Sequence, residues 1–174
     1  NVNLTPEPGT DMAMVGWRDG FHLKDNRAQF IWDGCKLEKV FDDVFNISCT
    51  MMRVSEVISD TEFKIYCQEF GGTYWMPLRA GDRVTLYNEK TGRMVGRTTI
   101  KEVVTQSGAD NHIIVEDLLP RNNVNVSIAV DSVSQPGSII RNCTVNGTLR
   151  FRSPVTVEDS TLNLMYAWID NLPN

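Results

Sequence analysis

The chain has 174 residues, which suits one domain or one domain with a small insertion. Its hydrophobic fraction of 41% and charged fraction of 22% are typical of folded globular proteins and exclude a largely disordered chain. A net charge of −5 without a basic stripe argues against nucleic acid as a partner, and no apolar run is long enough to span a membrane.

The first segment, residues 1–50, carries a short repeat. Residues 17–23 align with residues 41–47 at an offset of 24 residues (41 − 17). This period is typical of one solenoid coil, in which equivalent residues of stacked coils lie about 4.8 Å apart. We therefore expect aligned side chains to stack on one another: Trp17 on Phe41, Phe21 on Phe45, and Leu23 on Ile47.

The same repeat brings three carboxylates into one patch, those of Asp19, Asp42 and Asp43. Because side chains alternate along a strand, one of the two consecutive aspartates would be buried, which is costly for an unpaired charge. Either both lie on the turn that leads into the strand, or Asp42 pairs with Arg18 one coil back. Alternation also predicts which residues point away from the core: Gly20, His22, Val44 and Asn46.

Three interpretations of this patch remain open. Paired carboxylates can hydrolyse a glycosidic bond, one as acid and one as base, and crowding raises the pKa of one of them. His22 and Asn46 would then bind sugar hydroxyls. Alternatively, repeated aspartates cap solenoid turns, or three carboxylates hold Ca²⁺. No other cofactor is expected, and no metal site is assigned.

The middle segment, residues 51–133, changes in character. Six alternating stretches predict strands at 52–57, 62–66, 83–87, 94–104, 112–115 and 124–130, with a hairpin signal at 88–92. We expect a five- or six-stranded antiparallel β-barrel inserted between two coils. His112 is interpreted as structural. Tyr74 and Trp75 follow two glycines and would either fill a domain interface or stack on a sugar.

The last segment, residues 134–174, returns to the first pattern. Residues 140–145 align with 157–162 and, more loosely, with 32–37, which predicts three stacked coil strands. Arg150 and Arg152 flank Phe151 and share one face, where they would clamp a carboxylate or sugar hydroxyls, or make surface salt bridges. The four cysteines lack metal-ligand spacing and are expected in the core.

Two family resemblances rest on these motifs. Residues 19–23 and 42–43 resemble the D-G-[FI]-x-[IV] and D-D motifs of polygalacturonases, although the later G-H-G and R-x-K motifs of that family are missing. The resemblance implies Asp43 as general acid, Asp19 and Asp42 as the groups that position the attacking water, and inversion of the anomeric carbon.

The closer resemblance is to the bacterial β-helical α-1,3-galactosidases. It rests on residues 8–10, 15–22, 41–47, 80–82 and 167–170, in that order along the chain. It implies an exported, inverting enzyme that removes terminal α-linked galactose and carries a β-barrel after the D-D coil. Those enzymes are much longer, and both ends of this chain read like the interior of a domain, so we expect a segment of a longer protein.

The sequence therefore predicts an all-β fold, a right-handed parallel β-helix segment interrupted by a small antiparallel β-barrel. The predicted function is hydrolysis of a terminal α-galactoside on a glycan, in a secreted, periplasmic or cell-surface bacterial protein. A galacturonase or lyase, and a non-catalytic carbohydrate-binding protein, are the alternatives. Open solenoid edges would also favour self-association.

Overall fold

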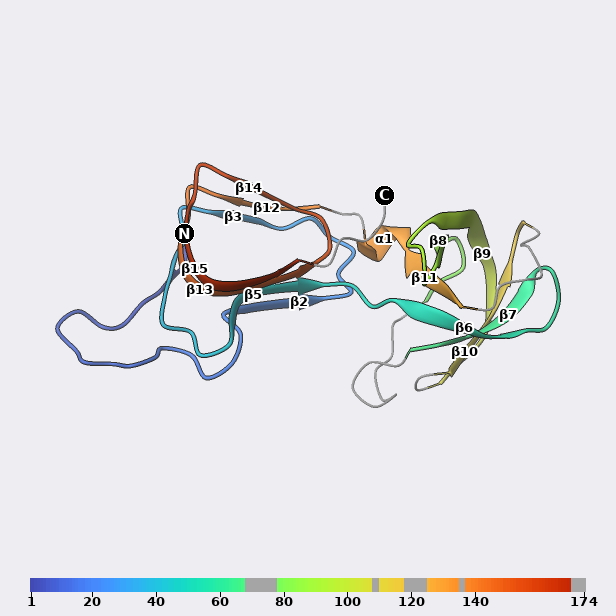
Figure 1. The fold of residues 1–174 in the computed structure, drawn as a ribbon, viewed down its shortest axis with the longest axis horizontal. Helices are drawn as coiled ribbons and strands as arrows, with labels where there is room; N and C mark the ends of the chain where they lie inside the picture. The colour runs from blue at the N-terminus through green and yellow to red at the C-terminus, as the bar shows by residue number, and fades with distance from the viewer. Residues whose placement is uncertain (68–77, 108–109, 118–124, 135–136, 170–174) are drawn as a thin grey trace. The chain divides into compact units, whose positions relative to one another are not determined.

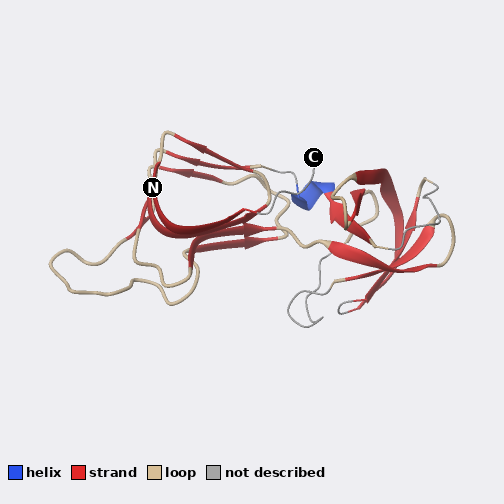
Figure 2. Cartoon of the chain, in the orientation of Figure 1, coloured by secondary structure: helices blue, strands red, loops and turns tan. Residues whose placement is uncertain are grey.

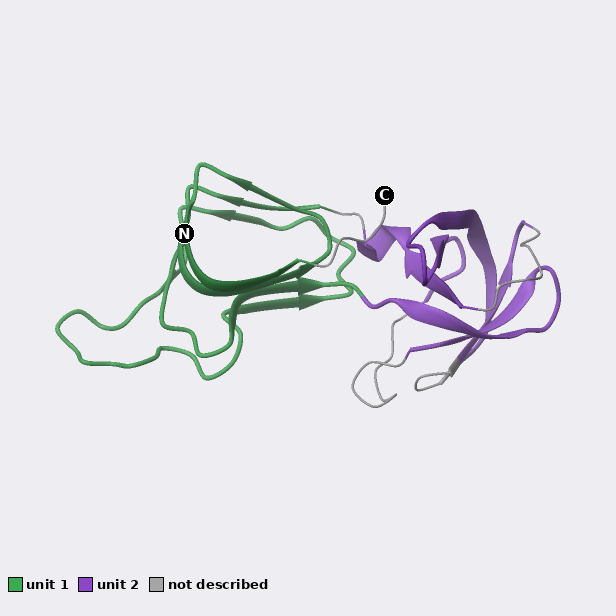
Figure 3. Cartoon of the chain, in the orientation of Figure 1, with its two compact units in different colours: residues 1–49, 135–171 green, residues 50–134, 172–174 purple. Residues whose placement is uncertain are grey.

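The structure is a computed structural model that describes residues 1–67, 78–107, 110–117, 125–134 and 137–169 (Figure 1). Strands form nearly all of its regular structure, and the one helix in these ranges is the short α1, Asp131–Ser134 (Figure 2). The chain divides into two compact units (Figure 3). The first contains Asn1–Cys49 and Gln135–Asn171, and the second contains Thr50–Ser134.

The first unit is built from two parallel sheets. The larger sheet has the order β1-β4-β13-β5-β2, with β15 also paired to β13. The smaller sheet has the order β14-β12-β3. The strands of the larger sheet are β1 (Asn3–Leu4), β2 (Phe21–Lys24), β4 (Lys36–Leu37), β5 (Asp43–Ser48), β13 (Thr144–Arg152) and β15 (Thr161–Ile169). Those of the smaller sheet are β3 (Ile31–Asp33), β12 (Ser138–Arg141) and β14 (Val155–Glu158).

The pairing register confirms the stacking predicted from the repeats. In β2 and β5, Phe21 lies opposite Phe45 and Leu23 opposite Ile47. In the smaller sheet, Ile140 of β12 lies between Trp32 and Val157. Residues of similar kind recur in the sequence because parallel neighbours place them on top of one another.

The core of the first unit lies between its sheets. Phe45 and Leu37 are fully buried, and Phe21, Trp32 and Phe45 contact one another through their rings. Burying a side chain of this size contributes roughly 1.5–3 kcal/mol. The four cysteines are buried, as predicted.

Strand β5 departs from the predicted alternation, because all of its residues are buried. Asp43 pairs with Thr148 and Phe45 with Leu149, so Val44 is the extra residue of a β-bulge. Val44 is fully buried in the core cluster, not exposed as predicted. Gly20 was also predicted to point away from the core, but a Cβ there would meet the carbonyl oxygen of Val44 at 2.7 Å.

The second unit is a closed antiparallel barrel of six strands, in the order β10-β7-β6-β11-β8-β9, within the predicted five or six. The strands are β6 (Met52–Val57), β7 (Glu62–Tyr66), β8 (Arg83–Asn88), β9 (Met94–Ser107), β10 (Asp110–Val115) and β11 (Val126–Val130). The Asn88 side chain accepts hydrogen bonds from the backbone N–H groups of Lys90 and Thr91, which fixes the predicted β8–β9 turn. His112 contacts Glu62 on β7 at 2.7 Å. In the described part of the chain, no helix is both long and apolar enough to cross a membrane.

Candidate functional site

Three carboxylates converge at the β2–β5 edge of the first unit. Asp19 precedes β2, Asp42 precedes β5, and Asp43 is the first residue of β5. One oxygen from each lies within 4.8 Å of the others. Asp42 is exposed and Asp43 is buried. The structure therefore brings together the three aspartates that the repeat singled out, and no ion pair joins Asp42 to Arg18, both of which are described.

The carboxylate of Asp19 is held by three donors. Its Oδ1 accepts a hydrogen bond from the backbone N–H of Asp43 at 3.3 Å. Its Oδ2 accepts one from Nδ2 of Asn46 at 3.0 Å and lies 2.9 Å from Nδ1 of His22. Since Asp43 and Asn46 belong to β5, the parallel neighbour of β2, Asp19 is bound across strands and does not merely cap its own turn.

Asp43 has an unusual electrostatic environment. Burial raises the pKa of its carboxyl group above the ordinary value, and the nearby charges of Asp19 and Asp42 act in the same direction. The Arg150 guanidinium, whose Nε lies 3.4 Å from Oδ2 of Asp43, and the Thr148 hydroxyl act in the opposite direction and do not cancel the effect of burial. The raised pKa favours the protonated form of Asp43, the form that a general acid needs.

Bulges aim the side chains around Asp43. Val44 is the extra residue of β5, and Met165 is the extra residue of β15, since Gly147 pairs with Leu164 and Thr148 with Tyr166. Bulges are frequent beside active sites, because they turn side chains away from regular alternation.

A row of polar and aromatic residues crosses four strands beside the carboxylates. His22 lies opposite Asn46, Asn46 opposite Arg150, and Arg150 opposite Trp168. The Cζ atoms of Arg150 and Arg152 lie 5.2 Å and 5.5 Å from the centre of the Trp168 ring. The two arginines thus share a face, as predicted, and all four predicted binding residues lie on β2, β5 or β13.

Sequence reasoning did not single out Trp168 as a site residue. The repeat of 140–145 at 157–162 has an offset of 17 residues (157 − 140), which would place Ala167 opposite Arg150. The bulge at Met165 adds one residue, and Trp168 takes that position. Two signals pointed to it: an aromatic residue one place off the repeat, and its position within 167–170, one of the segments that carry the family resemblance.

Several buried polar atoms at this site lack a hydrogen-bond partner. They are Oδ2 of Asp43, Oδ1 of Asn46 and Nε of Arg150, of which the first and last face one another as an ion pair at 3.4 Å without forming a hydrogen bond. An unsatisfied buried polar atom costs about 1–3 kcal/mol. A ligand that carries several hydroxyl groups would supply both donors and acceptors to these atoms.

The surroundings are less suited to a metal ion. Ca²⁺ requires six to eight oxygen ligands. Here both oxygens of Asp19 already accept hydrogen bonds, and the guanidinium of Arg150 lies beside Asp43. The cluster therefore resembles a set of acid–base groups more than a cation site.

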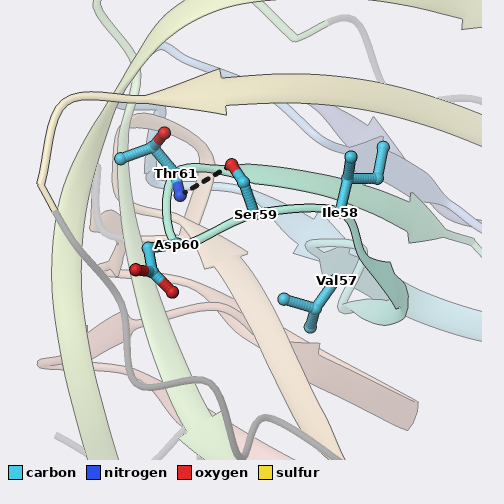
Figure 4. Close-up of a pocket in the computed structure, with 5 residues that line it drawn as sticks. All are labelled: Val57, Ile58, Ser59, Asp60 and Thr61. Atoms are coloured by element: carbon cyan, nitrogen blue, oxygen red, sulfur yellow. Dashed lines mark hydrogen bonds between the residues drawn. The ribbon is translucent and has the colours of Figure 1, made fainter.

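The barrel has a hollow of about 580 Å³, lined by Val57, Ile58, Ser59, Asp60 and Thr61 (Figure 4). A hydrogen bond from the Thr61 N–H to the Ser59 hydroxyl at 3.3 Å closes this turn. Its lining contains a single ionisable side chain, so it lacks the paired carboxylates of the first unit. Tyr74 and Trp75 lie outside the described residues.

Comparison with known proteins gives two curated relatives, while no family model matches the chain. The chain is 27% identical over 158 residues to the alpha-1,3-galactosidase B of Akkermansia muciniphila, covering 86% of this chain and 19% of that protein. It is 25% identical over 146 residues to the alpha-1,3-galactosidase B of Bacteroides thetaiotaomicron, covering 82% and 23%. The chain thus spans about a fifth of the length of these relatives, and the likeness supports a distant relationship to galactosidases.

Proposed function

We propose that this chain forms part of a glycoside hydrolase that removes terminal α-linked galactose from glycans with inversion of the anomeric carbon. The observation that carries the proposal is the convergence of Asp19, Asp42 and Asp43 within 4.8 Å. The distant relationship to proteins named as α-1,3-galactosidases supports the choice of sugar.

In the proposed mechanism, Asp43 is the general acid. It donates its proton to the glycosidic oxygen as the bond to the anomeric carbon breaks. Asp19 and Asp42 orient a water molecule and accept the proton that it loses as its oxygen attacks that carbon. The raised pKa of Asp43 supports this division, because the acid must hold its proton until the leaving group takes it.

We assign sugar binding to His22, Asn46, Arg150 and Arg152. Oδ1 of Asn46, which lacks a hydrogen-bond partner, supplies an acceptor to a ring hydroxyl, and the Arg150 guanidinium beside Asp43 supplies donors. His22 is half exposed and close to Asp19, where it can reach a hydroxyl of the same sugar.

The fold we propose for the first unit is a right-handed parallel β-helix. Along the chain, β3 is followed by β4 and β5, β12 by β13, and β14 by β15, so that each coil gives one stretch to the smaller sheet and one to the larger. Crossovers between parallel strands are right-handed in about 98% of cases.

The activity is tested with p-nitrophenyl α-galactoside and the full-length protein that carries this chain. The wild-type protein and Asp11→Asn, which removes an exposed carboxylate from the first unit, should both release nitrophenol. Asp43→Asn should lower kcat by about 100-fold or more, the usual contribution of a general acid. Equal activity in the Asp43→Asn variant, or none in the wild type, would contradict the proposal.

The stereochemistry needs its own measurement. The carboxylates approach one another within 4.8 Å, closer than the roughly 6.5–9.5 Å that separates most inverting pairs. Proton NMR of the first product formed decides the point. Inversion gives β-galactose first, whereas the appearance of α-galactose first would show a retaining route.

A galacturonase is a second candidate, because two arginines could hold a uronate carboxylate. Arg150 and Arg152 both lie against Trp168 on the face that we assign to the sugar. Parallel assays with α-galactoside and α-galacturonide substrates separate the two functions. Faster turnover of the galacturonide would favour this second candidate.

A further inference from the structure

Two aromatic rings stand exposed beside the carboxylates. Trp17 and Phe41 are 67% and 64% exposed. Their ring centres lie 4.9 Å apart with the planes inclined by only 5°. Each ring therefore covers one face of the other, and the outer faces stay open to solvent.

The backbone holds this pair in place. Gly16 and Val40 form a parallel β-bridge, and the Phe41 N–H donates to the Gly16 carbonyl at 2.9 Å. Exposed apolar area costs about 25 cal/mol per Å², so a fixed and exposed aromatic pair is unfavourable unless something covers it. A rigid surface of this kind binds a flat apolar face with little loss of conformational entropy.

The pair adjoins the aspartates along both chain segments. Trp17 lies two residues before Asp19, and Phe41 directly precedes Asp42. At about 3.3–3.6 Å per residue, the backbone of Trp17 is within about 7 Å of that of Asp19. This distance is comparable to the length of one sugar unit.

We propose that Trp17 and Phe41 form a second sugar-binding position, which stacks on the apolar C–H face of a neutral sugar unit adjoining the galactose. The inference rests on the proposed function and makes the substrate an oligosaccharide. A protein partner is less suitable, because whole aromatic side chains bury only about 150–250 Å² each, against roughly 800 Å² per partner in a typical interface.

The test measures binding to the full-length protein in an Asp43→Asn background, so that no ligand is cleaved. Galactose alone and a trisaccharide that ends in α-galactose are titrated by calorimetry. Trp17→Ala should weaken trisaccharide binding about 3- to 10-fold, the size of one aromatic contact, and leave galactose binding unchanged. Trp17→Tyr, which keeps an aromatic face, should restore most of the affinity.

Phe30→Ala is the matched control. Phe30 directly precedes β3, is also exposed, and stacks on Trp32 of that strand. It should bind both ligands like the parent. Unchanged trisaccharide binding in Trp17→Ala would overturn the inference. A large drop in its melting temperature would also overturn it, because another part of the protein would then cover the pair.

The experiments distinguish failure of the proposed hydrolytic activity from failure of the second sugar-binding position. If the wild type does not hydrolyse α-galactosides but Trp17→Ala weakens only trisaccharide binding, the site binds oligosaccharides without this activity. If hydrolysis occurs and both ligands bind Trp17→Ala like the parent, only the second position is wrong.

Discussion

At the scale of single residues, burial of Asp43 and the positive charge of Arg150 act in opposite directions on the Asp43 carboxyl group. The raised pKa means that the folded protein binds this proton more tightly than the unfolded chain does. The contribution of Asp43 to stability is then fully present below the ordinary aspartate pKa of 3.8 and is lost as the pH rises through the folded-state pKa.

We expect Asp43→Asn to raise the melting temperature at pH 7, since the amide stays neutral where the carboxylate ionises. The gain over the wild type should shrink as the pH falls through the folded-state pKa of Asp43 and disappear below about 3.8, where Asp43 is protonated in both states. Melting curves of both proteins between pH 3 and 8 measure it. If the melting-temperature difference between Asp43→Asn and the wild type grew toward low pH, the pKa of Asp43 would be lowered by folding and not raised.

We also expect Asn46→Ala to impair the enzyme more than His22→Ala. Asn46 is 6% exposed and donates to Asp19, so its removal leaves a buried carboxylate short of a donor, at a cost of about 1–3 kcal/mol. His22 is replaced by water more easily, because its side chain is 49% exposed. The ratio of the two kcat/KM values checks this, and a larger loss in His22→Ala would reverse our assignment.

At the scale of elements, strand pairing could be predicted because neighbouring parallel strands repeat residue types. The matches of Phe21 with Phe45 and of Ile140 with Val157 gave the register directly. The bulges at Val44 and Met165 were not predicted, since an extra residue is recognised only relative to a partner strand, and the repeats did not extend the register through these positions. The burial of Val44 and the position of Trp168 were missed for this reason.

Close packing around the first bulge leads to a prediction for Gly20→Ala. The added Cβ would meet the backbone oxygen of Val44 at 2.7 Å, which cannot rotate away. We expect a loss of about 1–3 kcal/mol in the free energy of unfolding. Gly16→Ala is the control, because its nearest contacts would be an ordinary 3.8 Å and 3.9 Å. Equal stability of the two variants in urea titrations would contradict the close approach.

At the scale of the whole molecule, the barrel is inserted in the sequence between the two segments of the first unit, and its own sheet is closed. Its first strand, β6, pairs with its last strand, β11, Met52 lying opposite Ile128. The barrel also has its own core, in which Phe63, Ile65 and Ile113 are almost fully buried.

We therefore expect residues 50–134, expressed alone, to fold as an independent domain. Dispersed amide signals in a proton–nitrogen NMR spectrum and a cooperative thermal transition would confirm it. A spectrum typical of an unfolded chain would show that the barrel depends on the first unit.

The pairing of β6 with β11 also bears on the order in which the protein assembles. Asp43 meets Thr148 and Arg150 only after the ribosome has made the whole intervening segment. A long unfolded connection would make that meeting slow, because loop closure must be offset before distant contacts form. If the barrel folds first, the pairing of β6 with β11 brings the two ends of the insert together and shortens this connection. The insert separates Asp43 from Thr148 and Arg150 in the sequence, yet its early folding would help these residues to meet.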